Sequence, residues 1–286
     1  MSNSSVLRGI YDERPVMQVR LRAEYGKRCV LSEVEFDLGA GEVLGMVGAS
    51  GAGKTTLVMA LLGPLFWRRD KASGEILIDG RNLLTMPSRE ARQTRGKRIA
   101  LVLQSSMTAL NPAVSLQAHF DAAWRAHQPT GRKALEFRLR QLTDEVQLPA
   151  DDENFLRRKP GQISVGQAQR VLIALVLLHG PSILIADEAT SALDPVTQSE
   201  IVRLLERLNP ETGTALLYIS HDLVSVLQLS HRIAVLGSGV IAEVLPTMQI
   251  GRARHPATLS LLNSLPVPVD LLLSHFGKET ADAVKA

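Results

Sequence analysis

The sequence has a single cysteine, Cys29, among its 286 residues. One thiol cannot form a disulfide within the chain, and it cannot supply a four-cysteine zinc or iron–sulfur site. The scarcity of cysteine fits a protein of a reducing compartment.

Long apolar stretches are also missing. The longest clean run, Val171 to Leu178, is far shorter than the roughly 18 residues that a membrane span needs. The segment from Met1 to Met17 has no apolar core of the kind found in secretory signals. We therefore expect a soluble protein that meets a membrane only through a partner.

Charge of one sign does not dominate either. Lys and Arg total 32 and Asp and Glu total 29, which gives a net charge of +3. Nucleic-acid binders usually cluster more positive charge, so we expect no nucleic-acid partner. Hydrophobic residues make up 45% of the chain, which is enough for a substantial core in one or two domains.

The order of apolar and polar residues predicts an α/β protein. Residues 17–25 and 33–38 alternate between the two kinds, which predicts antiparallel strands with one wet face. Residues 43–47 are almost all apolar, as expected of a strand buried on both faces. Further short strands are predicted at residues 75–79, 99–103, 183–186, 215–219 and 233–236.

Helical patterns separate these strands, and such alternation implies a parallel sheet with covered faces. A helix is expected from Thr56 to Leu62, and a second one after Asp194, which with Pro195 forms a helix start. Between residues 105 and 178 leucines recur at helical spacing. We expect an antiparallel β part and a first part of the core in residues 1–104, a helical subdomain in 105–178, a second part of the core in 179–250, and a weakly patterned tail in 251–286.

Residues 48–55 fit G-x-x-x-x-G-K-[ST], the pattern of a phosphate-binding loop. Its glycines let backbone N–H groups turn inward around phosphate oxygens, and the following helix adds its positive end. Lys54 is expected to reach the β- and γ-phosphates, and the Thr55 hydroxyl to ligate Mg²⁺. A glycine-rich turn with an incidental lysine is the alternative, but the motif leaves a buried strand and opens a helix. The predicted nucleotide-binding residues here are Gly48, Ala49, Ser50, Gly51, Ala52, Gly53, Lys54, Thr55 and Thr56.

Two adjacent carboxylates, Asp187 and Glu188, follow the predicted strand at residues 183–186. Ligands bind at the carboxyl ends of parallel strands, and neighbouring carboxylates repel unless a cation or proton divides them. Asp187 suits Mg²⁺, and Glu188 suits a residue that polarises the water attacking the γ-phosphate. The pair could instead merely end a strand, but the phosphate loop favours the functional interpretation.

Further features stand in a fixed order along the chain: Tyr25, Gln104, Ile163-Ser164-Val165-Gly166-Gln167, Asp194 and His221. With the loop and the acid pair, this order resembles the nucleotide-binding subunits of ABC transporters over about residues 17–265. The resemblance implies a P-loop NTPase (RecA-like) core with an N-terminal antiparallel β-subdomain and an inserted α-helical subdomain.

The resemblance also implies roles for these residues. Tyr25 would stack on adenine, Gln104 would sense Mg²⁺ and the attacking water, and His221 would hydrogen-bond the γ-phosphate. The segment Ser164–Gln167 would complete the ATP site of an opposing subunit, and Asp194 would lie at the dimer seam. Each has a structural alternative, such as a strand aromatic or a helix start. The implied catalytic residues are Glu188, His221, Gln104 and Lys54; the implied metal ligands are Thr55, Gln104 and Asp187; Ser164, Gly166, Gln167 and Asp194 complete the nucleotide contacts.

Val165 departs from the family pattern, which usually has glycine at this position. A β-branched side chain restricts the backbone and adds bulk at the contact that this chain is expected to make with the ATP of its partner. If the position requires a positive φ or a close approach of phosphate, this contact weakens, and we expect Val165→Gly to keep or raise ATPase activity.

Two motifs resemble the peptide, dipeptide and nickel importers of the family: residues 107–112 and His255-Pro256-Ala257-Thr258. This implies an ATP-hydrolysing importer subunit, with ATP and Mg²⁺, on the cytoplasmic face of the inner membrane. The implied partners are permease subunits, a second identical or different ATP-binding subunit and, indirectly, an extracytoplasmic substrate-binding protein.

Two other functions compete with this interpretation. A non-transport ABC ATPase acting on nucleic acid or the ribosome usually carries a long coiled coil or two ATP-binding halves, and this chain has neither. A P-loop kinase for a small metabolite would explain residues 48–55 but not Ser164–Gln167 or His221.

Overall fold

The computed structural model describes residues 15–26, 28–62, 71–104, 106–127, 131–149, 152, 154–191 and 193–283. It divides into two compact units. The first unit consists of Met1–Pro87 and Ala215–Ala286, and the second of Ser88–Thr214.

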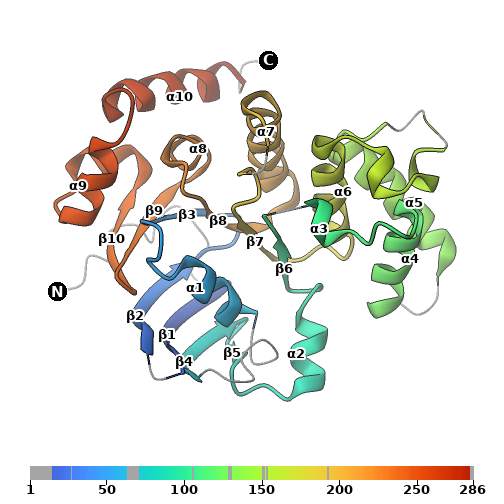
Figure 1. Ribbon diagram of the computed structural model, residues 1–286, viewed down its shortest axis with the longest axis horizontal. Coiled ribbons are helices and arrows are strands. Elements are labelled where there is room, and N and C mark those ends of the chain that lie inside the picture. Colours follow the sequence, from blue (N-terminus) through green and yellow to red (C-terminus); the bar gives the residue numbers. More distant parts are fainter. Residues whose placement is uncertain are drawn as a thin grey trace. The chain divides into compact units, whose positions relative to one another are not determined.

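A mixed β-sheet forms the first unit, with the strand order β5-β4-β1-β2-β10-β9-β3-β8 (Figure 1). Its strands are β1 (Met17–Tyr25), β2 (Arg28–Leu38), β3 (Val43–Val47), β4 (Lys71–Ile78), β5 (Arg81–Asn82), β8 (Ala215–Ile219), β9 (Arg232–Gly237) and β10 (Val240–Pro246). The helices of this unit are α1 (Lys54–Leu61), α8 (Leu223–Leu229), the 3₁₀ helix η5 (Thr247–Arg252), α9 (Pro256–Asn263) and α10 (Val269–Ala283).

The alternating segment near the N-terminus forms the strand predicted for it. In β1, Met17, Val19 and Leu21 are buried while Gln18 and Arg20 are exposed. β1 pairs antiparallel with both β2 and β4, so the predicted antiparallel sheet is confirmed. β2 starts at Arg28, earlier than the alternation alone predicted, and the strand predicted at 75–79 is the longer β4.

β3 is the buried strand expected at residues 43–47. Every residue in it is buried. It pairs in parallel with β8 on one side and β9 on the other, which confirms the parallel core. Because α1 follows β3, the phosphate loop lies at the carboxyl end of a central strand. α1 begins at Lys54, as the phosphate-loop motif predicts, and therefore before Thr56, where the apolar pattern alone placed its start.

An ion pair with a buried carboxylate joins the turn before β3 to the start of β9. The Glu42 side chain is 2% exposed, and one of its oxygens accepts a hydrogen bond from the Gly39 N–H at 2.7 Å. The other oxygen lies 3.0 Å from the Arg232 guanidinium, which also reaches Asp37 at 3.4 Å. Burial of a carboxylate is tolerated when it is paired and hydrogen-bonded in this way.

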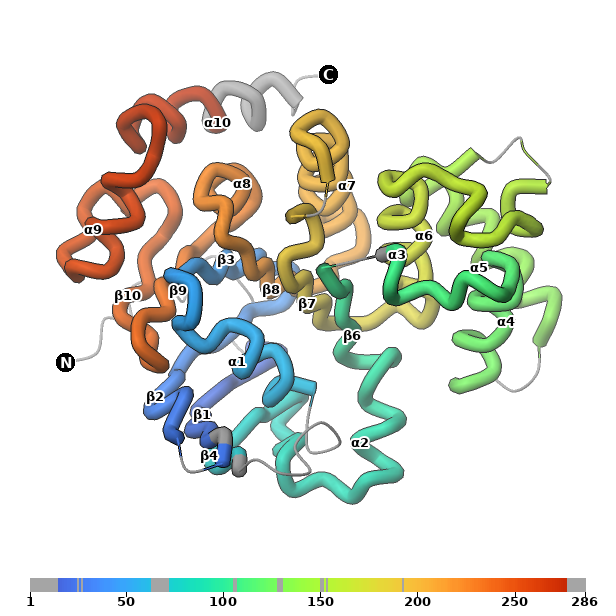
Figure 2. The backbone as a smooth tube through the Cα atoms, viewed as in Figure 1, coloured from blue at the N-terminus to red at the C-terminus, as the bar shows by residue number. Residues whose placement is uncertain are grey.

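The C-terminal residues correct the expectation of a weakly patterned tail from residue 251. The chain there forms α9 and α10, which follow one another in Figure 2. The Glu243 carboxylate fixes the start of α9, because it accepts hydrogen bonds from the N–H groups of Arg254 and His255 and from the Thr258 hydroxyl. α10 packs on α8. The sequence did not predict these helices, because their packing on the sheet and on α8 rather than a strong periodic pattern holds them.

The second unit contains two parallel strands and a set of helices. β6 (Ile99–Val102) pairs in parallel with β7 (Ile183–Asp187). The stretch expected to be mostly helical is confirmed, and α4, α5 and α6 lie close together in the tube of Figure 2. The helices are α2 (Ser88–Thr94), α3 (Ser106–Ala109), α4 (Leu116–His127), α5 (Arg132–Glu145), η3 (Phe155–Arg157), η4 (Pro160–Gln162), α6 (Val165–Leu177) and α7 (Pro195–Thr212). None of the helices in the described part of the chain combines the length and apolar character that a membrane crossing requires.

Candidate functional site

The loop between β3 and α1 depends on glycine at three positions. Gly51 and Gly53 have φ angles of +78° and +108°, a region that residues with a Cβ rarely adopt. At position 48 the requirement for glycine is steric, because a Cβ there would clash with the Leu236 carbonyl oxygen of β9. The loop therefore turns tightly and approaches the neighbouring strand at a distance that only glycine permits.

The start of α1 offers backbone N–H groups to an anion. Its N-cap, Gly53, has no side chain and makes no capping hydrogen bond, and the first turn contains no acidic residue. The first N–H groups of a helix have no partner within the helix, and the helix dipole makes this end positive. Thr55 is exposed and Thr56 half-buried at the same end. These features fit a phosphate group and Thr55 as an accessible hydroxyl ligand.

Lys54 places its ammonium group over this loop. The Nζ atom donates hydrogen bonds to the carbonyl oxygens of Gly48 at 2.7 Å and of Ala49 at 3.2 Å. The cation is thus folded back along the loop from the first turn of α1. A flexible ammonium at this place can exchange carbonyl oxygens for phosphate oxygens.

Two other predicted residues belong to the first unit. Tyr25 is the last residue of β1, but its side chain lies outside the part that the structure describes. His221 is exposed and stands between the end of β8 and the start of α8. The next residue, Asp222, is the N-cap of α8 and accepts the N–H groups of Val224 and Ser225, which fixes the backbone on which His221 is carried.

In the second unit, the structure brings together Gln104 and Glu188, which are 84 residues apart in sequence. The Gln104 amide donates a hydrogen bond of 3.0 Å to the Glu188 carboxylate. Asp187 is the last residue of β7, so both acids lie at the carboxyl end of that strand. Glu188 has a φ of +47°, a left-handed conformation that is uncommon for a residue with a side chain. Such backbone strain often occurs at functional sites, and here it sets the direction of the carboxylate.

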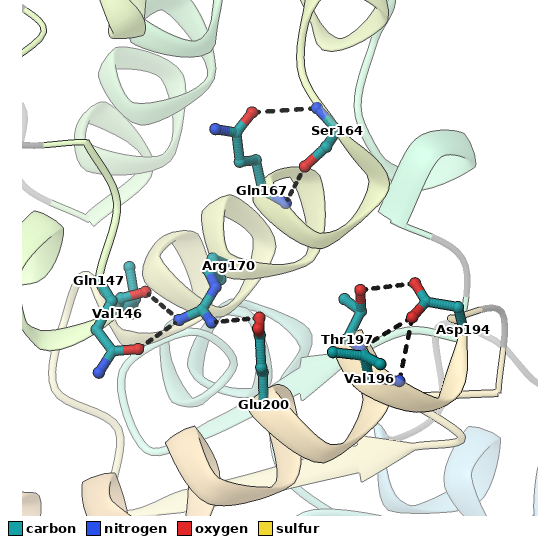
Figure 3. Close-up of polar contacts among 9 residues, drawn as sticks. All are labelled: Val146, Gln147, Ser164, Gln167, Arg170, Asp194, Val196, Thr197 and Glu200. Carbon is teal, nitrogen blue, oxygen red and sulfur yellow. Dashed lines mark hydrogen bonds and ion pairs between the residues drawn. The ribbon is translucent and has the colours of Figure 1, made fainter.

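The segment Ser164–Gln167 starts helix α6 with a reciprocal cap (Figure 3). The Ser164 hydroxyl accepts the Gln167 N–H, and the Gln167 side chain accepts the Ser164 N–H, each at 3.1 Å. This capping box is a sufficient local reason for both residue types. Val165 is the first residue of α6, is 45% exposed and is not among the residues with positive φ, so the backbone accommodates the valine without strain. The position therefore does not require a positive φ. The other premise for Val165→Gly, a close approach of phosphate to this residue, stays a prediction.

Asp194 caps helix α7, as the sequence predicted. Its carboxylate accepts the N–H groups of Val196 and Thr197 and the Thr197 hydroxyl, the last at 2.6 Å. These hydrogen bonds, the hydroxyl first, hold the pKa of Asp194 below its usual range. Thr197 also meets α6, because a Cβ on Gly166 would lie 2.8 Å from the Thr197 methyl group. The starts of α6 and α7 are therefore in contact (Figure 3).

The sequence did not single out the residues that join these helices. Arg170 of α6 contacts both the end of α5 and Glu200 of α7. Nothing in the sequence around Arg170 indicated a contact between helices, since arginines on helices usually lie on a solvated face.

Comparison with known proteins places these features in a context. Residues 31–191 match the family described as "ABC transporter". The chain is 38% identical over 248 residues to a probable peptide ABC transporter ATP-binding protein of Sinorhizobium fredii, covering 85% of this chain and 73% of the relative. It is also 38% identical over 251 residues to a probable D,D-dipeptide transport ATP-binding protein of Escherichia coli, covering 85% and 75%.

Solved structures share the fold. CbiO1 of Clostridium perfringens, described as part of an ABC transporter complex, matches with a TM-score of 0.71 and 24% identity over 83% of this chain and 91% of that one. An ATP-binding cassette solved as a dimer in a post-hydrolysis state bound to ADP and Pi matches with a TM-score of 0.67 and 25% identity over 81% and 98%.

Proposed function

The chain belongs to the ABC transporter family as an ATP-hydrolysing subunit, and from this membership we propose that it drives peptide uptake through a membrane permease. The S. fredii and E. coli relatives carry peptide and D,D-dipeptide transport in their descriptions, which supports peptides as the class of cargo. Nickel, which the sequence motifs also allow, stays a prediction. The observation that carries the proposal is the Lys54 ammonium held over a glycine loop at the start of α1.

The loop at residues 48–53 and the first turn of α1 bind the phosphates of ATP. Backbone N–H groups there face an anion, and the Lys54 ammonium neutralises the β- and γ-phosphates. Tyr25 stacks on the adenine ring in this proposal.

Mg²⁺ fits the donor atoms available. Thr55, Asp187 and Gln104 each carry an oxygen atom, which is the kind of ligand that Mg²⁺ prefers, and Mg²⁺ usually binds through one or two protein groups together with phosphates. In the described residues no three His, Cys, Asp or Glu side chains gather in a group that could hold a metal unaided. The phosphates of the nucleotide would supply the remaining oxygen ligands of Mg²⁺. When bound, it would neutralise charge on the phosphate oxygens.

Hydrolysis needs a group that orients and deprotonates water. We assign this to Glu188, whose strained backbone and hydrogen bond from Gln104 restrict its carboxylate to few orientations. His221 donates a hydrogen bond to the γ-phosphate, where negative charge increases during transfer. The reaction relies on positioning and electrostatics rather than on covalent intermediates.

The chain functions as a dimer with a second ATP-binding subunit, identical or different. Ser164, Gly166 and Gln167 at the start of α6 contact the partner's nucleotide, and Asp194 lies at the seam between the two subunits. The contact between the starts of α6 and α7 supports this, because it brings the two segments together.

Exposed apolar residues near Gln104 support docking of a permease. Leu103, Met107 and Val114 are 46%, 38% and 37% exposed and lie within one short segment around α3. Exposed apolar side chains that cluster mark interaction surfaces more often than isolated ones do. The chain then binds peripherally at the cytoplasmic face of the inner membrane, and an extracytoplasmic substrate-binding protein delivers the cargo to the permease.

Lys54→Ala tests nucleotide binding. Hydrogen bonds to charged groups contribute about 1.5–3 kcal/mol each, so we expect affinity for Mg·ATP to fall about 10- to 100-fold. Isothermal titration calorimetry measures this, and Lys133→Ala, an exposed lysine of α5, is the control that should keep wild-type affinity. Equal affinity of wild type and Lys54→Ala would remove Lys54 from the site.

Met107→Glu tests the permease contact. The substitution removes an apolar side chain from the docking surface and places a charge there. We therefore expect the fraction of the chain that sediments with cell membranes to fall at least about tenfold. ATP binding should be unchanged. Met248→Glu, at a methionine that is 69% exposed in η5, is the control. Unchanged sedimentation of Met107→Glu would place the docking surface elsewhere.

A further inference from the structure

Arg170 joins three helices of the second unit. Its side chain is 11% exposed, although arginine side chains usually reach solvent. One Nη atom donates to the Val146 carbonyl at 3.1 Å and to the Gln147 side chain at 2.9 Å, and the other lies 3.1 Å from the Glu200 carboxylate (Figure 3). The planar guanidinium carries five N–H donors in a fixed fork, so Arg170 holds partners on α5 and α7 in a defined geometry.

The ion pair lies at the same level on α6 and α7. Arg170 is six residues after the N-cap Ser164, and Glu200 is six residues after the N-cap Asp194. Each is therefore about 9 Å along its helix from the start. Nearer the starts, Gly166 packs on Thr197. This contact lies four residues before Arg170 on α6 and three residues before Glu200 on α7, so two contacts about one turn apart hold α6 against α7 near their starts.

The third partner couples this pair to α5. Val146 is the C-cap of α5, where carbonyl groups have no partner within the helix and the dipole is negative. An arginine at this place satisfies a carbonyl and interacts favourably with the helix end. Arg170 therefore contacts the end of α5 as well as Glu200 of α7.

We propose that Arg170 is a positioning residue that keeps Ser164–Gln167 and Asp194 level, so that both meet the second subunit and its nucleotide as one rigid edge. This rests on the proposed function, in which these segments face the partner. Arg170 itself does not touch the nucleotide; it acts through the register of α6 and α7.

A matched control exists in the same unit. Arg207 of α7 also donates to the end of α5, at the Glu145 carbonyl with 2.6 Å, and it lies 3.8 Å from Glu211 of its own helix. It therefore anchors α5 without bridging α6 to α7 through an ion pair. Arg207→Met removes an α5 anchor of the same chemistry, so both variants should lose some stability but only Arg170→Met should disturb the register.

The register is measured in the full chain with spin labels at positions 165 and 196, introduced as Val165→Cys and Val196→Cys. These side chains are 45% and 70% exposed, and Cys29→Ser removes the single native thiol. Electron paramagnetic resonance of folded protein, verified by circular dichroism, should show narrow dipolar coupling in the parent and with Arg207→Met, and a broadened or shifted distribution with Arg170→Met. An unchanged distribution with Arg170→Met, or equal broadening by both variants, would overturn the proposal.

Turnover of Mg·ATP by the unlabelled chain gives the functional readout. Misplacement by about 1 Å lowers rates about 100-fold, so we expect kcat of Arg170→Met to fall by about that factor with KM within threefold, and Arg207→Met to keep both near wild type. A fall in kcat shared by Arg207→Met contradicts a specific role. A wild-type chain without turnover contradicts the proposed function instead, and the spin-label result then decides the positioning role by itself.

Discussion

Glu188→Gln is expected to lower ATP turnover about 10²- to 10⁴-fold while Mg·ATP binding stays within about twofold of wild type, because general-base catalysis contributes a factor of this size. The amide that replaces the carboxylate has nearly the same shape, so it occupies the same space near Gln104. It cannot accept a proton from water. Binding depends on Lys54 and the glycine loop, which the substitution leaves intact.

Phosphate release and calorimetric titration on one preparation separate the two effects. Glu136→Gln is the control, since Glu136 is 57% exposed and pairs only with Arg132 among the ion pairs of the described residues. That variant should turn over at the wild-type rate. Normal turnover by Glu188→Gln would mean that another group activates the water.

Arg232→Met is expected to lower the free energy of unfolding by about 3–5 kcal/mol, because removing one partner of a buried ion pair leaves the other charge buried. The Glu42 side chain is only 2% exposed and would keep just its hydrogen bond from the Gly39 N–H. The loss would loosen the turn that leads into β3, the strand that ends at the phosphate loop.

Urea denaturation followed by circular dichroism measures this change. The double variant Arg232→Met with Glu42→Gln should recover much of the loss, since a neutral amide keeps the Gly39 hydrogen bond without a buried charge. Arg132→Met, in a pair whose arginine is 91% exposed, should change stability by less than about 1 kcal/mol. A loss below that level for Arg232→Met would show that the pair is effectively solvated.

The features that the sequence predicted best are those whose cause is local. Residues 43–47 had to be a buried strand because no polar side chain interrupts them, and Gly51 and Gly53 occupy backbone conformations that favour glycine. Asp194 followed by Pro195 predicted the start of α7 because a cap and a fixed φ act within three residues.

Contacts between distant segments could not be predicted in this way. The hydrogen bond between Gln104 and Glu188 depends on the parallel register of β6 and β7, which no local pattern encodes. The same holds for Arg170, whose role follows from how far α6 and α7 extend past their caps. The C-terminal helices α9 and α10 were missed because their packing on the sheet and on α8, rather than strong periodicity, holds them.

In the proposed function, backbone amides at the carboxyl end of β3 hold the triphosphate of ATP. Hydrogen–deuterium exchange with mass spectrometry tests it most directly, by comparing peptides that cover residues 48–56 without nucleotide, with Mg·AMP and with Mg·ATP. We predict that Mg·ATP slows exchange in these peptides and that Mg·AMP, which lacks the β- and γ-phosphates, does so far less. Exchange at residues 48–56 that is the same under all three conditions, with protein shown to be folded, would contradict the account.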